Sequence, residues 1–105
     1  MKVINMTPHA IVVDGMSETT YEPSGSVVRL DYESEELYAL NGNIVERNTL
    51  VDHNLPDPQD GTMLLVSAMV LTAFPERDDL LAPNTNKATR NEKGHIISIP
   101  GFVTN

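Results

Sequence analysis

The side chains best suited to chemistry stand in short polar stretches between apolar ones. His9 follows Thr7 and Pro8 near the start of the chain. Histidine can act as an acid, a base or a ligand, because its unperturbed pKa lies close to neutral pH. The fixed φ of the proline would bend the chain here and hold the histidine at a defined angle. The alternative interpretation is a surface histidine in a bent edge strand.

A second candidate is Ser67, which lies between the apolar stretches 62–66 and 68–74. Serine is a preferred helix N-cap, and the N-terminus of a helix attracts phosphate and carboxylate groups. No glycine precedes Ser67, so a phosphate-binding loop of the P-loop type is not predicted. The simpler interpretation is a helix cap with no further role.

Arg77, Asp78 and Asp79 form the third candidate, and Arg90 follows later in the chain. An arginine can bind a phosphate or a carboxylate through two parallel hydrogen bonds. Adjacent aspartates can hold a divalent cation through their oxygens. The alternative interpretation is an ion pair that fixes the loop, which contributes about 0–1 kcal/mol where it is exposed.

The composition excludes several classes of function. The chain has no cysteine, which excludes disulfides, thiolate zinc sites and cysteine nucleophiles. Its fifteen acidic and seven basic residues give a net charge of −8, so the clustered cations that bind double-stranded DNA are missing. The three histidines lack the spacing of metal ligands, and no serine lies in a G-x-S-x-G motif. We predict no cofactor and no metal site, and no motif requires an enzyme.

The N-terminal stretch has a broken apolar run with one lysine, which is not typical of a signal peptide. The longest apolar stretch, 63–74, is interrupted by Ser67 and Thr72 and is too short to cross a bilayer. We therefore expect a cytoplasmic protein that is not secreted and has no membrane partner.

The elements that must position these residues are short strands. We predict seven: one over 2–13 that bends at Pro8, and others at 19–21, 26–32, 37–40, 44–50, 62–66 and 96–99. Asn41-Gly42 is a strong hairpin signal, and Glu33–Glu36 is assigned to a loop or a strand end. The uninterrupted apolar run at 62–66 suits a central strand, and 68–74 suits one short helix that ends before Pro75.

The sum is a single α+β domain over residues 1–105 that is mainly β. We expect a compact twisted sheet or partial barrel over the one helix.

The polar stretches also resemble those of a known group of proteins. The order of Thr7-Pro8-His9, Pro75-Glu76-Arg77-Asp78-Asp79 and Arg90-Asn91-Glu92 is similar to that in small uncharacterised phage and prophage proteins. The resemblance extends over nearly the whole chain, although Asn91 stands where the family has an acidic residue. It implies a viral accessory protein in the cytoplasm of an infected bacterium, and it implies no particular activity.

Three hypotheses for function follow. The first is a non-enzymatic protein-interaction or structural accessory protein, which uses a sheet edge and the acidic run Asp31, Glu33, Glu35 and Glu36. Its partner would be a host protein, a phage protein or further copies of the same chain.

The second hypothesis is a small-molecule binding module for a nucleotide or another anion, acting in counter-defence by sequestration. Arg77 and Arg90 would bind charge, Ser67 a phosphate, and His9 a base or ribose. Thr7 would lie in the same site, which requires the polar loops to meet in one pocket. The third hypothesis is a small metal-dependent hydrolase built on His9, Asp78 and Asp79.

Overall fold

The computed structural model describes residues 1–105 and contains ten strands, one α-helix and one 3-10 turn. The α+β, mainly β class predicted from the sequence is confirmed, and the strands form four separate sheets with no closed barrel. The elements in chain order are β1 (Lys2–Asn5), β2 (Ile11–Asp14), β3 (Glu18–Tyr21), β4 (Leu30–Leu40), β5 (Asn43–His53), β6 (Thr62–Leu65), α1 (Ala68–Ala73), β7 (Leu80–Pro83), η1 (Thr85–Lys87), β8 (Thr89–Arg90), β9 (Ile96–Ser98) and β10 (Phe102–Val103).

The largest sheet has the strand order β1-β6-β7-β10. β1 and β7 both run parallel to β6, and β10 is antiparallel to β7. The prediction that the apolar run at 62–66 is an internal strand is therefore confirmed. Leu64 and Leu65 are both buried although successive side chains point to opposite faces, which explains why this strand shows no polar alternation.

Ser67 caps the N-terminus of helix α1, as predicted. The Ser67 hydroxyl accepts a hydrogen bond from the Val70 backbone N–H, which satisfies one of the free donors at the helix start. Val70 and Leu71 turn inward to join a buried core cluster whose other members are Met6, Leu55, Leu64, Val66, Phe74, Leu80 and Ala82. No helix of the structure has the length and apolar character needed to cross a membrane.

Some strands were not predicted. Leu80 and Ala82 of β7 are completely buried, but this strand has four residues and follows two aspartates, so it gives no periodic signal. β8 and β10 have two residues each. A strand over 26–32 was also predicted, but regular structure begins only at Leu30.

The assignment of Glu33–Glu36 to a loop or strand end is wrong, because these residues lie inside β4. β4 pairs antiparallel with β5 over the length of both strands, from Leu30 opposite His53 to Leu40 opposite Asn43. The turn between them is Asn41-Gly42, with φ of 51° and 82°, as predicted for a two-residue hairpin. Nearly all these side chains are exposed, so no apolar alternation marked the strand.

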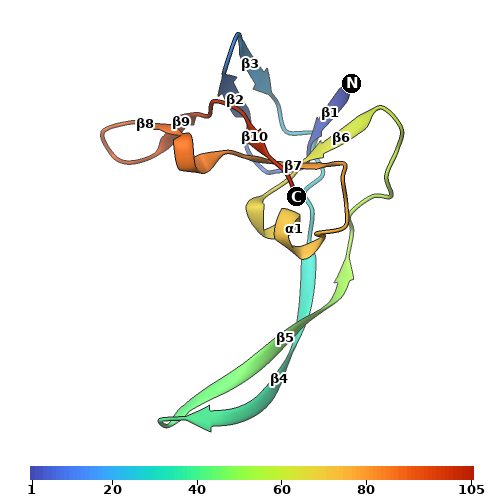
Figure 1. Ribbon diagram of the computed structural model, residues 1–105, viewed down its shortest axis with the longest axis vertical. Helices are drawn as coiled ribbons and strands as arrows, with labels where there is room; N and C mark the ends of the chain where they lie inside the picture. Colours follow the sequence, from blue (N-terminus) through green and yellow to red (C-terminus); the bar gives the residue numbers. More distant parts are fainter.

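We call the β4–β5 hairpin the arm. It pairs with no other strand and projects from the rest of the molecule (Figure 1). The radius of gyration is accordingly 16.6 Å, whereas about 13 Å is typical of a domain of this length. At its base, Leu30 and Leu50 pack against the core cluster, and the His53 ring meets the Phe74 ring edge-on at 4.8 Å.

The arm should be the least stable part of the fold, because an isolated two-stranded hairpin is only marginally stable in water. We expect Gly42→Ala to destabilise it locally by about 1–2 kcal/mol, since an alanine at this positive φ is strained although nothing else lies close to it. Amide exchange in the outer arm should accelerate roughly 5- to 30-fold, with an unchanged melting temperature for the whole protein.

Hydrogen exchange followed by NMR would measure this effect. Gly101→Ala is the control, because Gly101 also has open space around it and has no positive φ. If Gly42→Ala lowered the melting temperature of the whole chain, the arm would be part of the main folding unit.

Candidate functional site

Arg77 and Asp79 form a bidentate ion pair at the start of β7. The Arg77 Nε and Nη2 atoms donate to the two Asp79 carboxylate oxygens, each at 2.8 Å. Nη2 also donates to the carbonyl oxygen of Pro56 at 2.9 Å. Both side chains are largely buried. Arg77 is therefore engaged within the protein, and it ties the loop after the arm to the main sheet.

The pair shifts both ionisation equilibria. Hydrogen bonds from Arg77 hold the pKa of the Asp79 carboxyl below its ordinary value, against the opposing effect of burial. The same hydrogen bonds raise the pKa of Arg77. Because the folded pKa of Asp79 is lowered, its stabilising contribution is complete above the ordinary carboxyl pKa of about 3.9. That contribution is lost as the pH falls through the lower folded value.

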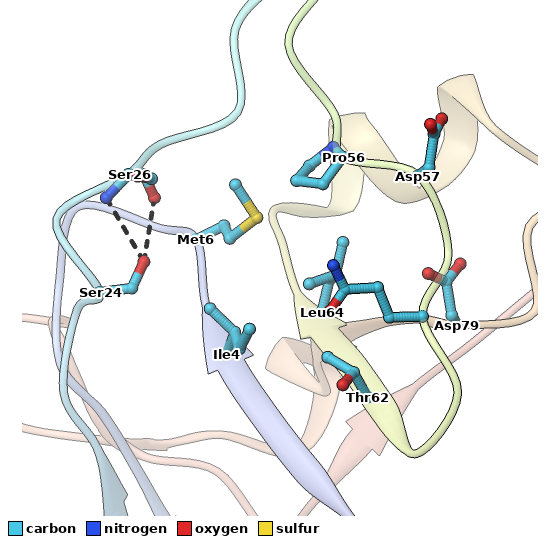
Figure 2. Close-up of a pocket in the computed structure, with 10 residues that line it drawn as sticks. Ile4, Met6, Ser24, Ser26, Pro56, Asp57, Thr62, Leu64 and Asp79 are labelled. Atoms are coloured by element: carbon cyan, nitrogen blue, oxygen red, sulfur yellow. Dashed lines mark hydrogen bonds between the residues drawn. The ribbon is translucent and has the colours of Figure 1, made fainter.

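A small cavity of about 250 Å³ lies beside Asp79 (Figure 2). Ile4 and Met6 line it on one side, and Leu64, Pro56 and Asp79 on the other. Its volume is below the range of about 300–1,000 Å³ that is typical of ligand pockets. The carboxylate of Asp79 is occupied by Arg77, but the polar residues Ser24, Ser26, Asp57, Gln59 and Thr62 also line the cavity. Its small volume is therefore what makes it a weaker ligand site.

The bend between β1 and β2 is built by Asn5 and Thr7. The Asn5 Nδ2 donates to the carbonyl oxygens of His9 and Tyr21, each at 2.8 Å. The Asn5 Oδ1 accepts from the Thr7 backbone N–H at 2.9 Å and lies 2.7 Å from the Thr7 hydroxyl. Thr7 is buried and has a structural role here. Asn5 was not predicted as a key residue, although an asparagine before a proline-fixed bend is a turn signal.

A larger cavity of about 480 Å³ brings together three of the predicted site residues, Thr7, His9 and Ser67. We call it the His9 cavity. Most of its wall is apolar, and its remaining lining residues are Pro8, Ala10, Ile11, Val12, Ala68, Pro83, Thr85, Ile96, Ile97, Ser98 and Ile99. The strands β2 and β9, the start of α1 and the bend at Pro8 therefore meet around it.

The polar groups of the His9 cavity are few, and two of them are already engaged within the protein. Ser98 donates to the Asp14 carboxylate at 2.7 Å, and the Thr7 hydroxyl is held by Asn5. The exposed imidazole of His9 and the hydroxyl hydrogen of Ser67 have no partner within the protein. No lysine or arginine lines the cavity. It therefore suits an apolar group with one or two polar atoms better than it suits a phosphate.

The other predicted site residues lie outside the His9 cavity. Arg77 and Asp79 are paired at the start of β7, and Asp78 is exposed between them. Arg90 is exposed in the β8–β9 hairpin, where its Nη1 donates to the Gly94 carbonyl oxygen at 2.8 Å. The single pocket that the nucleotide hypothesis requires, with two arginines beside Ser67, is not present.

Metal ligands do not converge in this structure. No group of three or more histidine, cysteine, aspartate or glutamate side chains is placed to hold a metal ion. His9 lines its cavity, whereas Asp79 is bound by Arg77. The geometry therefore gives the metal-dependent hydrolase hypothesis no support.

The arm is a long surface that no other strand covers. It carries six carboxylates and one arginine, a formal net charge of −5 out of −8 for the whole chain. Glu36 lies directly opposite Glu46, and neither forms an ion pair. Beyond this pair, four large apolar side chains near the tip are each 40–59 % exposed: Leu37, Tyr38, Leu40 and Ile44.

Comparisons with known proteins found no match. No protein-family model matches the chain, and neither a curated protein nor a solved structure is similar to it at a significant level.

The ion pair should be essential for stability. Arg77→Ala leaves the Asp79 carboxylate, which is only 7 % exposed, without its partner. We expect this change to lower the free energy of unfolding by about 3–5 kcal/mol at neutral pH, with a smaller loss in acid where Asp79 is protonated. Urea denaturation at several pH values would measure both effects.

Asp78→Ala is the matched control, because Asp78 is exposed and forms no ion pair. It should change the free energy of unfolding by less than about 0.5 kcal/mol. Equal losses for the Arg77 and Asp78 variants would contradict a structural role for the pair.

Proposed function

We propose that the protein is a non-enzymatic protein-interaction accessory protein that binds its partner through the arm. The observation that carries this proposal is a two-stranded hairpin, with eleven residues in each strand, that pairs with no other strand and has almost all its side chains exposed. A hairpin of this length gains little stability for the monomer. A partner that covers the hairpin would supply the stabilising contacts that the monomer lacks.

The charge of the arm indicates the chemistry of the partner. Like charges directly opposite each other on neighbouring strands are destabilising, and Glu36 faces Glu46 in this way. Cations from a partner would relieve the repulsion. Depletion of lysine from this surface and the net charge of −5 favour a basic binding surface on the partner.

The tip supplies the apolar part of the contact. Tyr38 and Leu40 are paired with Val45 and Asn43 on one face of the hairpin, and Ile44 lies opposite Ala39 on the other. Tyrosine is enriched among the residues that contribute most to binding, and the aliphatic groups beside it add apolar area. The resemblance to phage proteins supports an accessory role during infection.

A double arm variant tests this proposal. Tyr38→Ser together with Ile44→Ser removes two exposed anchors and should reduce partner capture from infected-cell lysate at least about tenfold, with unchanged folding. The readout is quantitative mass spectrometry of proteins retained by the immobilised chain.

The control is Met16→Ser together with Met69→Ser, which removes exposed apolar side chains outside the arm. Equal retention of the partner by the arm variant and the native chain would contradict the proposal.

A second candidate function rests on the His9 cavity. Its volume of about 480 Å³ is within the range of small-molecule pockets, and it gathers Thr7, His9 and Ser67. We propose for it an uncharged ring compound, such as a nucleoside, because no lysine or arginine is available for a phosphate.

Thermal shift with nucleosides and the matching nucleotides tests this candidate. A nucleoside at 100 times its dissociation constant adds about 2.7 kcal/mol, which corresponds to roughly 10 °C or more. His9→Ala should abolish the shift, and His95→Ala, a second exposed histidine outside the cavity, should not. The candidate would be contradicted if only the nucleotides raised the melting temperature, or if neither nucleosides nor nucleotides did.

A further inference from the structure

We infer that the arm of one copy of the chain docks in the His9 cavity of a second copy. This inference rests on the proposed function of the arm and names one partner for it. Three features of the molecule support it: the distribution of charge, the apolar match between tip and cavity, and the amount of surface left exposed.

The charge is divided between two parts of the molecule. The segment 85–98, which contains β8 and β9, carries the cations Lys87, Arg90 and Lys93 against one carboxylate, Glu92. All three cations are exposed and none forms an ion pair. We call this segment the basic lobe.

The basic lobe borders the His9 cavity. Thr85, Ile96, Ile97 and Ser98, which lie within the lobe, are part of the cavity wall. Outside the lobe, Arg29 and Arg77 are already paired with aspartates. An acidic segment that entered the cavity would thus lie beside the lobe that carries Lys87, Arg90 and Lys93, which is the complementarity that the net charge of −5 on the arm needs.

The apolar groups also correspond. Ile96 and Ile97 at the cavity are exposed, at 45 % and 55 %. The tip of the arm exposes Tyr38, Leu40 and Ile44, which are large enough to fill an apolar cavity of about 480 Å³ in part. Exposed apolar surface on both sides would be removed from water by the contact.

A chain cannot make this contact with itself. The arm and the basic lobe leave the body in different directions, and the arm tip lies far from β8 and β9 (Figure 1). The His9 cavity must therefore receive the arm of another copy. Either two copies exchange arms around a two-fold axis, or copies join head to tail in a ring or filament.

The exposed surface is large enough for such an exchange. The accessible surface is 7,323 Å², whereas a folded monomer of 11.6 kDa is expected to expose about 5,800 Å². The excess of roughly 1,500 Å² is about twice the 800 Å² that one partner contributes to a standard interface. That is the amount expected when each copy contributes both an arm and a cavity.

Sedimentation velocity on the native chain over a range of concentrations tests the inference. We expect self-association that weakens with added salt. Glu36→Lys with Glu46→Lys on the arm should raise the dissociation constant at least about tenfold, and Lys87→Glu with Lys93→Glu on the lobe should do the same. The four changes in one chain should restore association.

Ile97→Asp places a charge in the cavity and should also prevent association without unfolding, because Ile97 is exposed. A mixture of the Glu36→Lys/Glu46→Lys variant and the Ile97→Asp variant should form heterodimers. The first variant keeps an intact cavity, and the second keeps an intact arm. Glu22→Lys, an exposed acid outside the arm, is the control and should leave association unchanged.

A chain that stays monomeric at every concentration would overturn the inference, as would association that Ile97→Asp leaves intact. Partner capture by the monomeric protein, lost in the Tyr38→Ser/Ile44→Ser variant, would show that the arm binds another protein and would leave the proposed function standing. If the Tyr38→Ser/Ile44→Ser variant kept both partner capture and self-association, the inference and the proposed function would both be overturned.

Discussion

The arrangement of this molecule depends on one buried interaction, the bidentate pair between Arg77 and Asp79. Asp79 is the last residue before β7, and Arg77 also binds the carbonyl oxygen of Pro56, which follows the arm by only a few residues. One guanidinium group therefore joins the main sheet to the segment on which the arm ends. A buried charge requires its partner, so the fold must keep these two segments together. Leu55, beside Pro56, is buried in the same core cluster and adds an apolar contact to the electrostatic one.

Much of the body was predictable because its signals are local. The apolar run at 62–66, the cap at Ser67 and the turn at Asn41-Gly42 each follow from properties of a few neighbouring residues. The strand β7 was not predictable, because its burial comes from β6 and β10 on either side and its own four residues carry no period. The acidic part of β4 was missed for the opposite reason: its pairing with β5 holds it as a strand, while both faces stay in solvent.

The sequence indicated which polar residues are candidates for a site, but it did not indicate which of them lie together. Thr7, His9 and Ser67 do share a cavity, but the hydrogen bonds of Arg77 and Arg90 hold these two side chains outside it. A sequence shows that a polar residue lies in a loop, whereas the direction of its side chain depends on which acceptors the fold places beside it. Arg77 binds Asp79 two residues away and also the distant carbonyl oxygen of Pro56, and Arg90 binds the nearby Gly94 carbonyl oxygen.

The two long edges of the arm affect the tendency of the protein to aggregate at high concentration. Each strand of an unaccompanied hairpin has one row of backbone N–H and C=O groups with no neighbour, and such rows promote unspecific strand addition and fibril growth. Carboxylates at Asp31, Glu33, Glu35 and Glu36 would repel a second arm that approached side by side. By general strand-edge physics, such charges disfavour side-by-side addition of further strands and let a long hairpin stay uncovered in water.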